Sequence, residues 1–392
     1  MTFKYQIAVL GQSKDRLPVF RDALLRQTDA LGLDRAHIQI VEESKLGTID
    51  EKSPLVVVFF GYVDADDSSH TKLRDLLAKS VTVIPCVDRA GEVSRQLPES
   101  IRHINAYQSG YQDADWARLI TLVLENLRLL RAERRLFISY KRSESQSIAV
   151  QLYEAFDKAG FDVFLDTRSV PCGEDFQSIL WHRMADSDVV VLLDTPNFRV
   201  SYWTTQEQAR ANATNIQILH LLWPRVRADK SSAFSEFHQL HPTDFRGRKR
   251  TGAGCQLIDK AADDIVAGAE SLRARALAAR HRSLVDNFCD QAKHQPVKYL
   301  AVQPERYISV ELNSGTKVAV VPTIGVPRAD RYHEIEDAIR KSGSKPEQVW
   351  LLYDERGILE SWLNHLDWLD SHLPVSSVRV SRCAGRLGGG AK

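Results

Sequence analysis

The chain has 392 residues, of which 43% are hydrophobic, so it can bury two or three ordinary cores. Its 52 basic residues balance 51 acidic residues, which excludes a bulk electrostatic argument for binding to nucleic acid or to an anionic membrane. The five cysteines are dispersed without metal-ligand spacing, and no apolar run approaches the roughly 20 residues that span a bilayer. With no signal peptide at the start, these features predict a cytoplasmic protein without a metal site.

The first segment, residues 1–131, alternates short apolar runs with stretches of helical periodicity, which predicts an α/β domain. Residues 54–61 are apolar at nearly every position, as is typical of a central parallel strand that helices cover on both faces. The predicted strands are 7–10, 38–41, 54–61 and 81–85, and the predicted helices are 18–31, a short helix including 71–75, and 116–131.

The second segment, residues 134–292, alternates in the same way, which predicts a mostly parallel sheet with right-handed crossovers. Residues 225–256 are polar and include the basic run 246–250, for which a solvated surface loop is favoured over a phosphate contact. Residues 258–291 are predicted to form one long helix. The other predicted strands are 137–140, 162–165, 188–193 and 216–223, and the other predicted helices are 148–159, 176–185 and 202–213.

The third segment, residues 296–383, is predicted to be an α/β accessory domain of unknown role, and residues 384–392 are predicted to be a flexible tail. Aromatic and leucine side chains recur at helical spacing over 358–371, which is typical of a core or docking face. The predicted strands are 307–310, 318–321 and 349–353, and the predicted helices are 332–341 and 358–371.

Three motifs follow one another in the second segment. They are Phe137-Ile138-Ser139-Tyr140 at the end of the first strand, Phe164-Leu165-Asp166-Thr167-Arg168 at the end of the second, and Ser201-Tyr202-Trp203-Thr204-Thr205-Gln206-Glu207. In this order they resemble a Toll/interleukin-1 receptor (TIR) domain. The last resembles the S-x-W-x-x-x-E helix that carries the catalytic glutamate of TIR domains that consume NAD.

The resemblance implies an α/β fold of consecutive flavodoxin-like or TIR-like three-layer units with mostly parallel sheets, followed by the C-terminal α/β segment. The first segment resembles a TIR domain with a degraded catalytic helix, because Lys72 stands near the place that Glu207 has in the second and no tryptophan precedes it. A flavodoxin-like domain with only architectural similarity is an equal alternative for the first segment.

For the second segment, the resemblance implies a site that cleaves NAD as its substrate, with no cofactor and with Glu207 as the catalytic residue. It also implies substrate-binding roles for Ser139, Tyr140, Arg142, Ser201 and Trp203. Each of the following residues also has an explanation that involves no substrate. Ser201 can cap its helix, Trp203 can anchor the core, and Arg142 and Glu207 can be solvated surface residues. The aspartate usual in the first loop of the family is Glu144 here.

The chemistry of NAD cleavage fits this motif. Trp203 and Glu207 lie four residues apart on a predicted helix and therefore share a face. A carboxylate there would stabilise the positive charge that develops on the ribose, and no general acid is required because nicotinamide leaves as a neutral pyridine. The sequence has no G-x-G-x-x-G, P-loop or H-E-x-x-H motif, which argues against a dehydrogenase, a P-loop enzyme or a zinc protease.

Two functions remain open. The leading one is an NAD glycohydrolase or ADP-ribosyl cyclase in bacterial antiviral or stress signalling, with the first or third segment as the receiver of an unknown trigger. The rival is a non-enzymatic scaffold that self-associates through TIR domains. The resemblance places Asp166 and Arg168 in the loop that would mediate such assembly, although a local ion pair explains them equally well.

Overall fold

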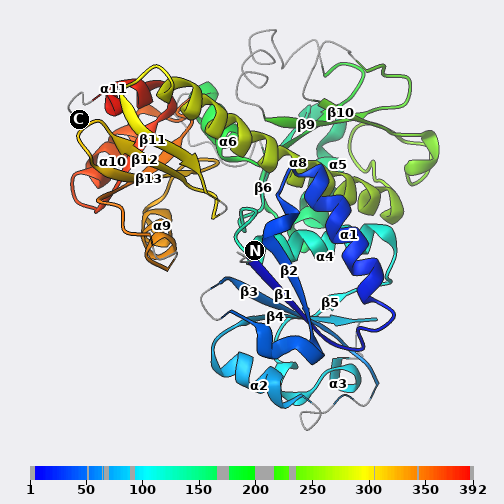
Figure 1. The fold of residues 1–392 in the computed structure, drawn as a ribbon. Helices are drawn as coiled ribbons and strands as arrows, with labels where there is room; N and C mark the ends of the chain where they lie inside the picture. Colours follow the sequence, from blue (N-terminus) through cyan, green and yellow to red (C-terminus); the bar gives the residue numbers. More distant parts are fainter. Residues whose placement is uncertain are drawn as a thin grey trace. The chain divides into compact units, whose positions relative to one another are not determined.

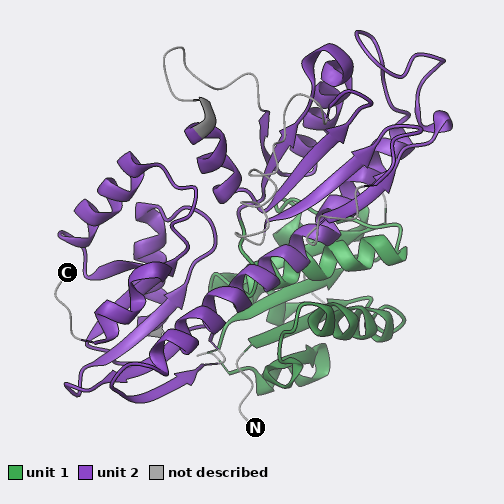
Figure 2. Cartoon of the chain, turned by 90° about the horizontal axis from the view of Figure 1, so that it is seen from above, with its two compact units in different colours: residues 1–132 green, residues 133–392 purple. Residues whose placement is uncertain are grey.

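The computed structural model describes residues 5–50, 53–63, 65, 70–88, 93–165, 176–198, 216–228, 235–303, 305–341 and 344–388. Contacts along the chain divide it into two compact units, residues 1–132 and 133–392 (Figure 2). The first unit contains one five-stranded sheet and the second contains two (Figure 1). None of the helices in the described part of the chain is long and apolar enough to cross a bilayer.

The first unit is a parallel α/β domain. Its strands pair in the order β2-β1-β3-β4-β5, which is the flavodoxin-like arrangement. Helix α4 ends at Asn126, before the predicted end at residue 131, because Arg128 takes a left-handed φ of 59° that no helix can continue through. The elements are β1 (Tyr5–Gly11), α1 (Leu17–Ala30), β2 (Ile38–Glu42), β3 (Leu55–Phe60), α2 (Thr71–Ala78), β4 (Thr82–Val87), α3 (Val93–Gln96), β5 (Tyr107–Gln108) and α4 (Asp113–Asn126).

The second unit begins with a parallel sheet of the same topology. Its strand order is β10-β9-β8-β6-β7, so the first strand in the chain again lies between the second and the third. Strand β10 falls in the polar stretch 225–256, for which no strand was predicted. The elements are β6 (Arg135–Ser139), α5 (Arg142–Lys158), β7 (Asp162–Leu165), α6 (Phe176–Asp186), β8 (Val189–Asp194), β9 (Gln217–Leu222), β10 (Ser235–Gln239) and α8 (Asp259–Ala292).

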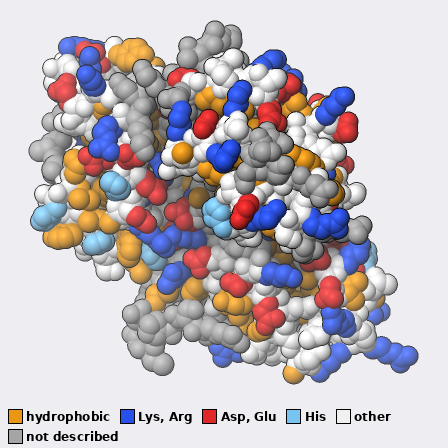
Figure 3. All heavy atoms as spheres, turned by 90° about the horizontal axis from the view of Figure 1, so that it is seen from below, with side chains coloured by type: hydrophobic (Ala, Val, Ile, Leu, Met, Phe, Trp, Pro, Cys, Tyr) orange, Lys and Arg blue, Asp and Glu red, His pale blue; other side chains and the backbone are white. Residues whose placement is uncertain are grey.

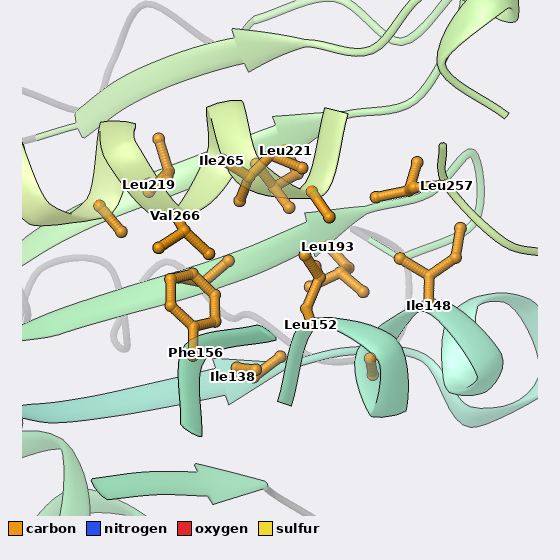
Figure 4. Close-up of a cluster of buried hydrophobic side chains, with 14 of the residues drawn as sticks. Ile138, Ile148, Leu152, Phe156, Leu193, Leu219, Leu221, Leu257, Ile265 and Val266 are labelled. Carbon is orange, nitrogen blue, oxygen red and sulfur yellow. The ribbon is translucent and has the colours of Figure 1, made fainter. Parts of the chain in front are cut away.

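Two apolar clusters cover the two faces of this sheet. On one face, α5 and the first half of α8 pack against β6, β8 and β9, and Figure 4 shows Phe156, Leu193 and Ile265 meeting there. On the other face, Phe137 stacks on Phe164 with ring centroids 5.4 Å apart, and α6 adds its own apolar side chains. Phe137 therefore belongs to the core of this domain.

The rest of the second unit is a mixed sheet in the order β11-β12-β13-β14-β15, antiparallel at β11–β12–β13 and parallel from β13 onward. Strands β11 and β15 were not predicted. The prediction of a flexible tail from residue 384 is wrong for its first residues, because α11 continues to Leu387 and buries that side chain. The elements are β11 (Val297–Val302), β12 (Ile308–Leu312), β13 (Lys317–Pro322), α9 (Ala329–Lys341), β14 (Gln348–Tyr353), α10 (Glu360–Asp370), β15 (Val375–Arg379) and α11 (Cys383–Leu387).

The aromatic and leucine stripe of α10 divides between core and surface. Leu363, Leu366 and Leu369 are buried in the core of the third sheet, as the periodicity indicates. Trp368 is 56% exposed and stacks on His365, with ring centroids 5.9 Å apart. Histidine and hydrophobic side chains accordingly lie together at the left of Figure 3, the side on which Figure 1 draws this sheet.

Helix α8 joins the two sheets of the second unit, as Figure 1 shows. At 34 residues it is about 50 Å long. Its first half packs on the parallel sheet, and its last turns, with Leu284 and Phe288, pack on the third. Between them, Arg273 forms an ion pair with Asp188 at 2.8 Å, and both side chains are 0% exposed. Arg134 and Glu270 form a second buried pair beside it.

We expect Arg273→Met to lower the free energy of unfolding of the second unit by about 3–5 kcal/mol, because Asp188 would remain buried without its cation. Urea denaturation followed by tryptophan fluorescence measures this loss. The exposed pair between Lys260 and Asp264 on the same helix provides the control, and Lys260→Ala should change stability by less than about 0.5 kcal/mol. Equal urea midpoints for Arg273→Met and wild type would contradict the expectation.

Candidate functional site

The topology of the parallel sheet in the second unit singles out one crevice. The chain crosses from β6 to β7 on one side and returns to β8 on the other, so the strand order reverses between β6 and β8. Open α/β sheets bind ligands at the carboxyl ends of the strands at such a switch point. The loop after β6 with the first turn of α5, residues 140–144, and the loop after β8, residues 195–198, flank it.

A polar network ties these two loops together. The amide of Asn197 donates to Glu144 Oε1 at 2.8 Å, and the backbone N–H of Asn197 approaches Oε2 at 3.4 Å. Lys141 Nζ donates to the backbone carbonyl of Asn197 at 3.1 Å and lies 3.3 Å from Glu144. The loop after β8 is therefore held at its start by the loop after β6.

The network also sets the charge state of Glu144. Burial would raise the pKa of this carboxyl, but hydrogen bonds from Asn197 and Lys141 outweigh burial and lower the pKa below its usual value. The side chain therefore stays anionic at neutral pH. The side chain of Glu144 reaches across to the loop after β8.

The structure describes three of the predicted substrate-binding residues. Ser139 ends β6 and is 3% exposed. Tyr140 is 1% exposed and belongs to the core cluster between α5 and α8, so its ring contributes to packing. Arg142 is exposed at the start of α5, at the rim of the switch point. Of the three, only Arg142 has an exposed side chain, and the three substrate-binding roles stay predictions.

The remaining predicted site residues lie outside the described residues. Ser201, Trp203 and Glu207 fall within residues 199–215, and Asp166 and Arg168 fall within residues 166–175. Their place in the chain still matters. Residues 199–215 continue directly from the loop that Glu144 and Lys141 hold, and residues 166–175 join β7 to α6.

The basic run 246–250 is exposed throughout, as expected for a surface loop. Its neighbour Gly252 donates its backbone N–H to the carbonyl of Glu144 at 2.7 Å, and Gly254 donates to Ser147 Oγ at 3.0 Å. Gly252 has a φ of +78°, a conformation that side chains disfavour. The loop is therefore anchored against the first turns of α5, beside the switch point.

Sequence reasoning missed a buried polar chain across β8, β9 and β10. Asp194 Oδ2 lies 2.8 Å from His220 Nδ1, and His220 Nε2 lies 3.1 Å from Ser235 Oγ. The order matches that of a nucleophilic triad, but Asp194 and His220 are 1% and 5% exposed. We interpret it as a satisfied core network that joins β10 to the sheet. The described ranges contain no cluster of three or more His, Cys, Asp or Glu that could hold a metal.

In the first unit, side chains from several loops meet at the equivalent edge. Arg16 donates to the carbonyl of Gly61 at 3.1 Å and to Asp88 at 2.8 Å, and its guanidinium lies 4.2 Å from the centre of the Tyr111 ring. Lys72 is exposed on α2. Arg16 thus links the described parts of the loops that follow β3, β4 and β5.

Comparison with protein families matches residues 136–258 to the family model described as "TIR domain". The match runs from β6 to the residue before α8, so the second unit contains a TIR domain. A search of curated proteins finds no match. Among solved structures, the chain is similar to "Crystal structure of protein VC1899 from Vibrio cholerae", with 12% identity, 98% of this chain and 96% of that chain covered, and a TM-score of 0.19. A score this low supports no conclusion about fold or function.

We expect Glu144→Gln to destabilise the second unit at neutral pH by at most about 1 kcal/mol, since the side chain is at the surface edge of the network. A carboxyl with a lowered folded-state pKa stabilises the fold above its unfolded pKa of about 4.3 and loses that contribution as pH falls through the folded value. The difference between variant and wild type should therefore shrink in acid.

Urea midpoints at neutral pH and near pH 3 measure this difference, with the exposed Glu154→Gln on α5 as the matched control. A difference that stays constant over this range would contradict the role given to the Glu144 carboxylate.

Proposed function

We propose that the TIR domain of this chain cleaves the bond between nicotinamide and ribose in NAD, with Glu207 as the catalytic carboxylate. The observation that carries the proposal is the position of the S-x-W-x-x-x-E motif within the matched range 136–258. The described geometry supports it, because the segment with Glu207 leaves the sheet at the switch point between β6 and β8.

The reaction needs little from the protein. The C1′–N bond breaks, its electron pair stays on the nicotinamide nitrogen, and the positive charge moves to the ribose. Glu207 would stabilise that charge, and water or the adenine ring of the same molecule would capture C1′ to give linear or cyclic ADP-ribose. Arg142, which is exposed at the start of α5, would contact the pyrophosphate.

The first unit would not catalyse this reaction. At its carboxyl edge, Arg16 bonds to Gly61 and Asp88 and lies over the Tyr111 ring, and the sequence has Lys72 near the place of the glutamate. We therefore assign one working site to each chain, with the first unit as an inactive TIR-like domain.

Glu207→Ala is expected to lower the rate of nicotinamide release from NAD by at least about 100-fold, the usual cost of removing a group that stabilises charge in the transition state. Release is followed chromatographically on the full chain at high protein concentration. Glu154→Gln, an exposed carboxylate on α5, should retain the wild-type rate. Equal rates for wild type and Glu207→Ala would exclude the catalytic role of Glu207.

The scaffold alternative has one structural observation in its favour. Residues 166–175 precede α6, and the third sheet holds the end of that helix firmly: the N–H of Val326 donates to Asp186 at 3.0 Å and that of Leu359 donates to His182 at 3.3 Å. Because α6 is held in place, it would provide a fixed end for the preceding residues 166–175 if they bind a neighbouring chain.

The scaffold predicts that Asp166→Ala and Arg168→Ala abolish self-association in light scattering, while Glu207→Ala has no effect on association or on the cellular phenotype. Under the enzymatic proposal, Glu207→Ala removes the phenotype while the chain still assembles. The two functions are therefore separated by the cellular phenotype of Glu207→Ala.

A further inference from the structure

The third sheet holds the end of α6 with the loops that follow two of its parallel strands. These loops are residues 323–328 after β13 and residues 354–359 after β14. Ala185 of α6 belongs to the core cluster of the third sheet. Gly357 has a φ of +83°, and a Cβ atom there would lie 3.3 Å from the carbonyl oxygen of Trp181 on α6. The loops and α6 are therefore closely packed, and we call this contact the α6 joint.

Two backbone hydrogen bonds cross the α6 joint, and they differ in their acceptors. The N–H of Val326 donates to the carboxylate of Asp186 at 3.0 Å, and the N–H of Leu359 donates to His182 Nδ1 at 3.3 Å. Asp186 also forms an ion pair with Arg135 on β6, which favours its charged form. A histidine nitrogen, in contrast, accepts a hydrogen bond only while it carries no proton. The bond to Leu359 therefore depends on the charge state of His182.

The bond to Leu359 lies at the start of α10. Leu359 is the N-cap residue of this helix, and its own side chain makes no capping hydrogen bond. A proton on Nδ1 of His182 would set two N–H groups against each other. It would also place a positive charge at a helix N-terminus, where the helix dipole disfavours cations. Trp362, in the first turn of α10, has its ring centroid 5.8 Å from that of His182.

The surroundings of His182 favour the neutral imidazole. Burial lowers the pKa of His182 below its usual value, the charges of Arg183 and Arg328 lower it as well, and Asp186 opposes them. The charged and titratable residues on the elements that pack here are Arg183 and Asp186 on α6, Arg328 after β13, Asp354, Glu355 and Arg356 after β14, and Glu360 and His365 on α10.

The direction of the pH dependence follows from this lowered pKa. A histidine whose pKa is lower in the folded state contributes its full stabilisation above the unfolded value of about 6.5. That stabilisation is lost as the pH falls through the folded value. The bond between His182 and Leu359 is thus complete at neutral pH and is lost in acid.

We propose that His182 makes the α6 joint sensitive to pH: its neutral imidazole holds the start of α10, and its protonation releases it. The contacts of Asp186 with Val326 and of Ala185 with the core do not require His182, so the joint loosens without separating. The third sheet then holds the TIR domain less firmly in acid than at neutral pH. The proposal does not depend on NAD cleavage, because the joint is measured without turnover.

Hydrogen exchange on the full chain between pH 7.5 and 5.0, corrected for the intrinsic pH dependence of exchange, tests the proposal. In wild type, protection of the peptide spanning residues 357–363 should fall about fivefold or more as the pH drops, as expected for the loss of one hydrogen bond. His182→Asn keeps an acceptor near the place of Nδ1 and does not titrate, so its protection should stay constant. His182→Leu should show the low protection at both pH values.

The exposed His333→Gln on α9 is the matched control and should respond to pH as wild type does. The peptide spanning residues 348–353 in β14 reports on the whole third sheet and should keep its protection in every variant. Three results would each overturn the proposal. They are unchanged protection at 357–363 in wild type, an equal loss in His182→Asn, and an equal loss in β14, which would make the acid effect global.

Discussion

The buried ion pair between Arg273 and Asp188 fixes helix α8 against the parallel sheet of the second unit, and the rest of that unit depends on this contact. Apolar contacts alone would let the helix shift along or rotate about its axis. The buried Arg273 and Asp188 prevent this, because either charge would be left without solvent or partner if the helix moved. Because α8 continues into the core of the third sheet, that sheet is placed by the same pair. Two turns further along α8, Arg280 adds a second buried contact by donating to the carbonyls of Ala185 and Ser187.

The topology of the parallel sheet in the second unit decides where a ligand could bind, at the carboxyl ends of its strands. Parallel strands bring every loop after a strand to one edge, and the reversal between β6 and β8 opens a crevice there. Glu144 and Lys141 hold the loop after β8 at Asn197, so the chain enters the segment with Glu207 from a fixed point. A catalytic carboxylate needs such a start, because transition-state stabilisation depends on preorganised position.

Much of the fold could be predicted from the sequence because burial leaves a clear pattern. Strands such as β3 and β8 are covered on both faces and read as apolar runs, and α8 reads as one helix because no Pro interrupts it. The strands that were missed, β5, β10, β11 and β15, lie at sheet edges. An edge strand has a neighbour on one side only and can be polar, as Ser235–Gln239 is, so it leaves no apolar run in the sequence. No local pattern could indicate that Asp194, His220 and Ser235 meet across three strands, or that Tyr140 belongs to the core.

The most direct test of NAD cleavage by this chain is mass analysis of the products formed from NAD by the full chain at high protein concentration. The account predicts free nicotinamide together with linear or cyclic ADP-ribose. NAD recovered intact, at a concentration where light scattering shows assembled chains, would contradict it.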